Sequence, residues 1–84
     1  MTKIKICGLM SAEDAELAGK SGADFGGVVM FFPKSHRNTD AEKASEIVSV
    51  LKENGTVPVA VTVEPDSEQI EIIKSCGFEY IQIH

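Results

Sequence analysis

The chain has 84 residues, 13 of them acidic and 8 basic, and a net charge of −5, which argues against a general nucleic-acid or anionic-membrane surface built from clustered lysine and arginine. Hydrophobic residues make up 43% and charged residues 25%, an ordinary balance for a globular protein and not one typical of disorder. We therefore expect a single domain over residues 1–84.

The first predicted element is a strand over residues 3–9, in which polar and apolar side chains alternate. It brings Cys7 to its carboxyl end, where a turn leads into a helix over about residues 12–20. Ser11 can cap this helix, and Asp14 favours its positive end. In parallel α/β folds, the carboxyl ends of strands are where ligands and catalytic groups gather, so Cys7 is a candidate site residue.

A second strand is predicted over residues 24–31, nearly continuous in apolar residues, as in a parallel strand buried on both faces. Gly26 and Gly27 inside it indicate a bulge or tight packing against a neighbour. Residues 32–39 form the longest polar connection. Thr39 then begins a capping-box pattern and the clearest amphipathic helix of the chain, whose apolar positions are Ala41, Ala44, Ile47, Val48 and Leu51.

A third strand follows at residues 57–63, with Pro58 tolerable only near its start. Asp66 or Ser67 caps a third helix that ends at about Ser75 and directs Ile70, Ile72, Ile73 and Cys76 toward the sheet. The fourth strand is residues 79–84. Alternation of four strands with three helices predicts right-handed crossovers and a parallel sheet of the α/β class.

Ligand patterns for metals and common cofactors are missing from the sequence. Cys7 and Cys76 are far apart and form no C-x-x-C pair, so we expect reduced thiols. His36 and His84 lack a third ligand at metal-binding spacing, and neither a P-loop nor a G-x-G-x-x-G run occurs. No apolar run approaches the roughly 18–20 residues of a membrane span, and the first residues lack the apolar core of a secretion signal. We therefore expect no metal, no cofactor, no membrane contact and a cytoplasmic location.

Three stretches carry a family resemblance: Lys-Ile-Cys-Gly-Leu at residues 5–9, the segment at residues 27–37, and Tyr-Ile-Gln-Ile-His at residues 80–84. Together they resemble the amino-terminal part of phosphoribosylanthranilate isomerase, a tryptophan-pathway enzyme built as a (β/α)8 barrel. Because such a barrel typically needs about 250 residues, 84 residues cannot close one alone. The resemblance implies a half-barrel, a parallel βαβαβαβ unit with four strands and three helices.

The resemblance also implies roles for individual residues. From the residue alone, Cys7 could be a base, a nucleophile, a metal ligand or a small core residue. In the family, the cysteine of this motif is the general base of an Amadori rearrangement, and it acts as the thiolate, which positive charge from Lys5 would favour. Arg37 resembles the family arginine that pairs with the anthranilate carboxylate, although His36 stands where the family usually has proline.

Two further residues are candidate substrate contacts. Gln82 is expected to point into the sheet interior, either as a substrate contact or as a satisfied core polar group. His84 resembles the histidine of the family's Gln-Leu-His-Gly run. The family's general acid aspartate has no counterpart, because Asp24 and Asp66 fall elsewhere, and its phosphate-binding loops near the end of the barrel are also absent.

The expected function is therefore that of the isomerase family, acting on a small phosphoribosyl substrate, with little turnover by the isolated residues. The alternative is a non-catalytic half-barrel that self-associates or binds a small anion or a partner. Exposed outer strands invite association. One hypothesis is that two copies, or this chain and a complementary half-barrel, form an eight-stranded barrel.

Overall fold

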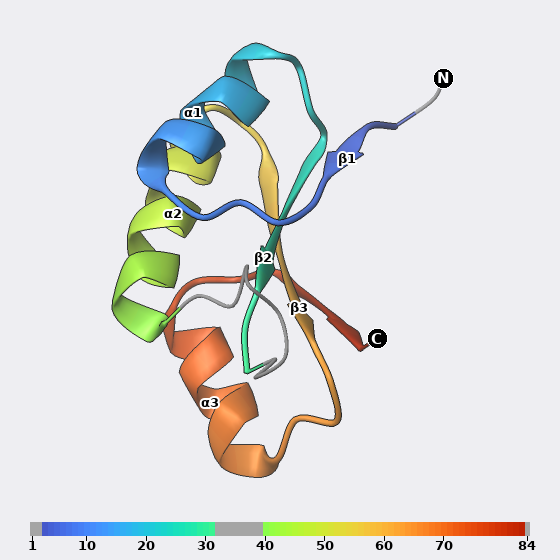
Figure 1. Ribbon diagram of the computed structural model, residues 1–84, viewed down its shortest axis with the longest axis vertical. Helices are drawn as coiled ribbons and strands as arrows, with labels where there is room; N and C mark the ends of the chain where they lie inside the picture. The colour runs from blue at the N-terminus through green and yellow to red at the C-terminus, as the bar shows by residue number, and fades with distance from the viewer. Residues whose placement is uncertain (1–2, 32–39, 84) are drawn as a thin grey trace.

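Strands and helices alternate along the chain in a computed structural model that describes residues 3–31 and 40–83. The elements are β1 (Lys5–Ile6), α1 (Ala12–Lys20), β2 (Phe25–Val29), α2 (Ala41–Glu53), β3 (Val57–Thr62), α3 (Ser67–Ser75) and β4 (Tyr80–Ile83). The four strands are parallel and lie in the order β1-β2-β3-β4. This arrangement confirms the predicted α/β half-barrel, and Figure 1 shows the three helices together on one side of the strands.

Most predicted elements are present, but their ends differ in instructive ways. β1 has only two residues in the ladder, fewer than the predicted 3–9. Gly8, at φ 80°, interrupts the extended backbone, although the Leu9 amide still donates to the Gly27 carbonyl of β2 at 3.1 Å. The prediction of Thr39 as the cap of α2 is wrong: Asp40 is the cap, and its carboxylate accepts from the Lys43 amide at 2.8 Å. Thr39 itself lies outside the described residues. α3 begins and ends where predicted.

Asp66 is the cap of α3, one of the two residues predicted for this role. Its carboxylate accepts from the Gln69 amide at 2.8 Å, and the Gln69 side chain accepts from the Asp66 amide at 3.2 Å. This reciprocal capping box pairs two backbone amides that a bare helix end would leave unpaired. It explains why the start of α3 is so clearly readable in the sequence.

The hydrophobic core fills the space between the helices and one face of the sheet. In β2 and β3 the buried side chains that point toward the helices alternate with residues of the opposite face, as the pleat of a strand requires. Of the apolar residues predicted on α3, Ile73 and Cys76 are buried, whereas Ile70 and Ile72 are only half-buried. The core residues include Val28, Met30, Ala44, Ile47, Leu51, Ala60 and Ile73.

Gly26 lets α2 approach β2. A Cβ added at Gly26 would lie 2.7 Å from a methyl carbon of Leu51 on α2 and 3.0 Å from a methyl carbon of Leu9. β2 pairs with β3 residue by residue through this position, so there is no bulge. Of the two predicted alternatives, tight packing is the one observed.

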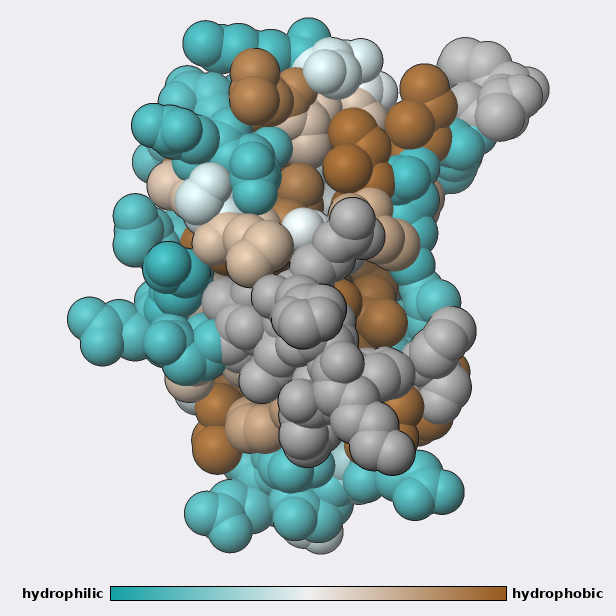
Figure 2. Space-filling model, in the orientation of Figure 1, coloured by the Kyte–Doolittle hydropathy of each residue, from teal (hydrophilic) through white to brown (hydrophobic). Residues whose placement is uncertain are grey.

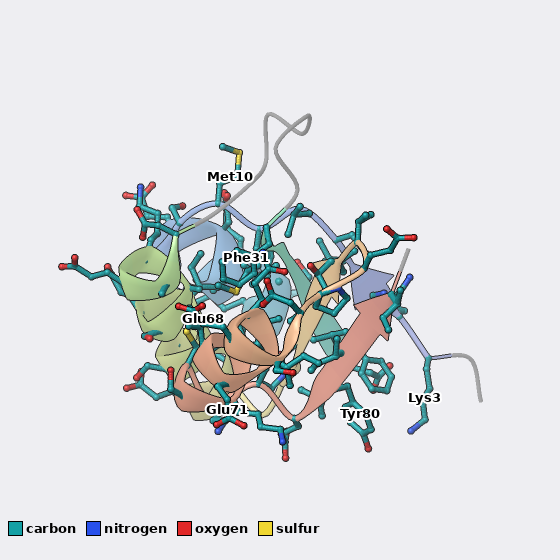
Figure 3. All side chains as sticks on the ribbon, turned by 90° about the horizontal axis from the view of Figure 1, so that it is seen from below. Lys3, Met10, Phe31, Glu68, Glu71 and Tyr80 are labelled. Atoms are coloured by element: carbon teal, nitrogen blue, oxygen red, sulfur yellow. The ribbon has the colours of Figure 1, made fainter. Side chains whose placement is uncertain are left out.

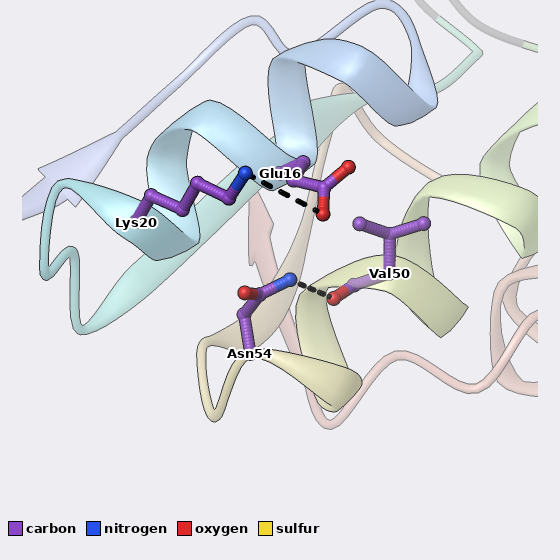
Figure 4. Close-up of polar contacts among 4 residues, drawn as sticks. All are labelled: Glu16, Lys20, Val50 and Asn54. Atoms are coloured by element: carbon purple, nitrogen blue, oxygen red, sulfur yellow. Dashed lines mark hydrogen bonds and ion pairs between the residues drawn. The ribbon is translucent and has the colours of Figure 1, made fainter.

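α1 and α2 also approach closely, and a glycine again permits the contact. A Cβ added at Gly19 would lie 2.3 Å from the Cβ of Asn54, the residue that ends α2. Asn54 is held there because its side-chain amide donates to the Val50 carbonyl at 2.9 Å (Figure 4). The neighbouring Glu16–Lys20 pair, at 4.0 Å on the exposed side of α1, contributes little because solvent screens it.

The substitution Gly26→Ala should destabilise the fold. Because the added methyl overlaps two buried leucine side chains, we expect a loss of about 1–3 kcal/mol in the free energy of unfolding. Urea unfolding followed by circular dichroism measures it. The matched control is Ser49→Ala on the exposed side of α2, expected to stay within about 0.5 kcal/mol of the unchanged chain. An equal effect of both substitutions would contradict the packing argument.

Candidate functional site

The face of the sheet opposite the helices is open in the described part of the chain. Parallel pairing aligns Phe25 with Val57 and Val29 with Val61, and these side chains point away from the helices. Lys3 lies on the same side, with its ammonium 5.6 Å from the centre of the Phe25 ring. Figure 3 shows Lys3 and Tyr80 beyond the sheet, away from α1 and α2. We call this surface the helix-free face; its strand positions are Lys5, Phe25, Gly27, Val29, Val57, Val59, Val61, Tyr80 and Gln82.

Cys7 follows β1 directly and lies beside this face. Its side chain is exposed and its thiol is free. Gly27 of β2 forms the floor beneath it, since a Cβ added there would lie 3.1 Å from Cys7 Sγ and 3.3 Å from Cys7 Cα. The thiol at the carboxyl end of β1 is thus seated against backbone, with its outer side open to a ligand.

A groove opens next to Cys7, between β1 and α1. It has a volume of about 390 Å³ and is lined by residues of the loop after β1 and by one side of α1. The loop is held by Asp14, whose carboxylate accepts from the Met10 amide at 3.0 Å. Met10 stands out beside the loop in Figure 3, and Figure 2 shows hydrophobic surface in the region of α1 and β1. Cys7 therefore borders both the groove and the helix-free face.

Gln82 lies on the helix-free face of β4, and its amide oxygen accepts a hydrogen bond from Lys5 Nζ. Both side chains are exposed. Of the two alternatives for Gln82, the satisfied core polar group is not what the described residues show, because Gln82 is exposed and no second layer covers this face there. The hydrogen bond joins β1 to β4, two strands separated by β2 and β3.

The other site predictions have different outcomes. Arg37 and His84 lie outside the described residues. Asp24 has a structural role, because its carboxylate accepts from the Ile4 amide at 2.8 Å and fixes the start of β1. The structure thus brings Cys7 and Gln82 to one face. Lys5 as the partner of Gln82 was missed, although strand alternation already puts both residues on the same face.

Residues 3–31 and 40–83 contain neither a metal-binding cluster nor a membrane-spanning helix. No group of three His, Cys, Asp or Glu side chains lies close enough together to hold a metal ion. None of the helices described there has the length and apolar character needed to cross a membrane. The side chains that could do chemistry on or beside the helix-free face are the Cys7 thiol, the Lys3 and Lys5 ammonium groups and the Gln82 amide.

Comparison with known proteins gives a consistent result. The family model for N-(5'-phosphoribosyl)anthranilate isomerase matches residues 4–84. The isomerase of Aquifex aeolicus is 43% identical over 84 residues, covering 100% of this chain and 41% of that protein. A chloroplastic isomerase of Arabidopsis thaliana is 39% identical over 82 residues, covering 96% of this chain and 33% of that protein.

Solved structures agree. Monomers of the dimeric phosphoribosylanthranilate isomerase from Thermotoga maritima superpose with a TM-score of 0.87 at 35% identity, over 100% of this chain and 42% of that one. The Thermus thermophilus enzyme gives a TM-score of 0.86 at 31% identity, over 99% of this chain and 41% of that one. The chain spans about 40% of the length of these bacterial relatives.

The two thiols should react at different rates. Cys7 is exposed, whereas Cys76 is 7% exposed and its thiol donates to the Ala41 carbonyl at 3.4 Å. We expect a chromogenic disulfide reagent to titrate one thiol rapidly in the native chain and the second only as the chain unfolds. Cys7→Ser should remove the fast phase. Rapid titration of both thiols without denaturant would contradict the observed burial.

Proposed function

Because the chain belongs to the N-(5'-phosphoribosyl)anthranilate isomerase family, we propose that it carries the amino-terminal part of the active site of this enzyme. The reaction is the Amadori rearrangement of N-(5'-phosphoribosyl)anthranilate to the carboxyphenylamino-deoxyribulose phosphate in tryptophan biosynthesis. The observation that carries the proposal is the position of Cys7. Its exposed thiol lies at the carboxyl end of β1 over the Gly27 backbone, where a parallel barrel gathers its catalytic groups.

In this proposal Cys7 is the general base. Its thiolate takes the proton from C2′ of the ring-opened substrate, in which C1′ is double-bonded to the protonated anilino nitrogen. The electrons of the C2′–H bond form a double bond between C1′ and C2′, and the π electrons of the C1′=N bond return to the nitrogen. The enol so formed becomes the ketone of the product. Such a base must stay reduced, and both cysteines are free, which fits a reducing compartment such as the cytoplasm.

The proposed substrate contacts come from three positions. Arg37 pairs with the anthranilate carboxylate through its two parallel N–H groups. Gln82 and His84 contact the substrate from the end of the fourth strand. Of these, Gln82 is supported by its place on the same face of the sheet as Cys7.

A general acid and a phosphate site must come from outside these residues. No aspartate in the sequence matches the family's acid, and the late phosphate-binding loops have no counterpart. We propose that a complementary half-barrel supplies them, because a second copy of these residues would lack the same groups. The 84 residues alone would then bind the substrate weakly and orient it poorly, and we expect their turnover to be small.

A second candidate function, a self-associating half-barrel without catalysis, rests on the two outer strands. β1 and β4 each have one neighbour in the described sheet, which leaves one row of backbone groups without a strand partner. Large apolar side chains stand exposed on or near these strands: Ile4 at 51%, Tyr80 at 60% and Ile83 at 66%. In this proposal β4 of one copy pairs with β1 of the other.

The enzymatic proposal is tested by following the fluorescence decay of phosphoribosylanthranilate with the purified chain. We expect little or no turnover at low protein concentration. Activity that rises faster than linearly with protein, and that Cys7→Ser abolishes, would show that copies assemble a working site. Addition of the carboxyl-terminal half of a family member should raise turnover at least tenfold, about 1.4 kcal/mol in the barrier.

The control for that experiment is Cys76→Ser, which changes the other thiol, a packing residue of α3 that the proposal keeps out of the chemistry. A complemented sample that is equally active with and without Cys7 would overturn the assignment of the base. Complementation that fails although the two halves co-purify would overturn the proposal that this chain supplies its share of the site.

Self-association is tested by sedimentation velocity. We expect a dimer at micromolar concentration, because pairing buries the exposed strand edges and apolar side chains. Ile83→Lys places a charge at the β4 edge and should shift the chain to monomer, whereas Glu46→Lys on the exposed side of α2 should not. A chain that is only monomeric at these concentrations would rule out the self-associating alternative.

A further inference from the structure

The hydrogen bond from Lys5 to Gln82 is the side-chain link that joins the first and last strands in the described sheet. A lysine ammonium only donates, so the atom of Gln82 that faces it is the amide oxygen. A lysine side chain has many rotamers, and an exposed one is ordinarily free to sample them. Here the ammonium donates to the Gln82 amide oxygen, which directs it over the helix-free face.

The register shows what lies beneath this bond. Lys5 is aligned with Phe25 and Val57, and Gln82 is aligned with Val61. Along β2 and β3 these two alignments are four residues apart, which is two same-face steps of about 6.6 Å each. The row between them contains Gly27, Val59 and Tyr80, and Cys7 sits over Gly27 at its β1 end. The bond therefore crosses the row that leads to the thiol.

The charge on this face has one sign. None of the four strands contains Asp or Glu, although the chain has 13 acidic residues and a net charge of −5. The positive groups at the face are Lys5 and, further from Cys7 along the chain, Lys3. Lys3 lies over the Phe25 ring. The strand positions of the helix-free face thus carry a lysine and no acidic group, although the chain as a whole is acidic.

We propose that Lys5 is a ligand-binding residue that attracts a small anionic group to the helix-free face beside Cys7, and that Gln82 positions its ammonium. This inference rests on the proposed function, whose phosphoribosyl substrate is anionic. Gln82 uses one N–H of the ammonium, so two remain for oxygen atoms of a ligand. The role of Gln82 is then to hold the cation in place as well as to meet the substrate.

Cys7 itself provides the test, because its alkylation needs no turnover. Iodoacetate and iodoacetamide both react by attack of the thiolate on the CH2 carbon, which forms a C–S bond and releases iodide. They differ in that iodoacetate is an anion and iodoacetamide is neutral. The ratio of their rates at Cys7, read by peptide mass spectrometry, measures how strongly the site favours an anion.

We expect Lys5→Met to lower the iodoacetate to iodoacetamide ratio about three- to fivefold, the range of an exposed ion pair. Lys5→Arg, which keeps the charge, should retain most of the preference. Lys3→Met is the matched control and should change the ratio by less than about 1.5-fold, because its charge lies over Phe25. Gln82→Leu should lower the ratio by about twofold, since the ammonium is no longer held.

If Lys5→Met and Lys3→Met lowered the rate ratio equally, the proposal would be overturned. The ratio would then depend on the overall charge of the protein and not on the position of Lys5. So would an unchanged ratio in Lys5→Met, and an unchanged ratio in Gln82→Leu would remove the positioning role of Gln82. Circular dichroism spectra confirm that each variant is folded. Failure of this test leaves the isomerase proposal standing, because complementation measures that proposal separately.

Discussion

The structure depends on burial of one face of a four-stranded parallel sheet beneath three helices. Buried side chains of β2 and β3 pack against Ile47 and Leu51 of α2, and this contact forms the centre of the hydrophobic core. Parallel sheets ordinarily have both faces covered. In the described residues helices cover one face only, and the open face is the one on which the proposals place a ligand or another half-barrel.

Two glycines of β2 connect the packing of the core to the position of the Cys7 thiol. Gly26 and Gly27 are neighbours on β2, so their missing side chains serve opposite faces of the same strand. Gly26 admits the leucines of the core, and Gly27 admits Cys7. One pair of residues therefore seats α2 on one face and the candidate base on the other. A side chain at either position would disturb a different layer of the molecule.

Sequence analysis predicted the elements well because their signals are local. Asp66 and Gln69 lie three residues apart and cap α3 by themselves, and the apolar spacing of α2 follows from its helical period. The cap at Asp40 was less predictable, since Thr39 and Asp40 are adjacent and either could serve as the cap. The end of β1 was also less predictable from the sequence. The Lys5–Gln82 bond was not predictable, because it depends on how four strands curve together.

Under the proposed function, the helix-free face holds the base but not a complete site. An Amadori rearrangement needs one group to remove a proton and another to deliver one. The four strands described here offer a thiol at the end of β1, lysines and an amide, and no carboxyl group. An acid placed beside Lys5 would pair with the ammonium and lose its proton more readily. In the proposed arrangement, an acid in the remaining part of the barrel would leave the Lys5 ammonium free for the substrate and would itself stay protonated.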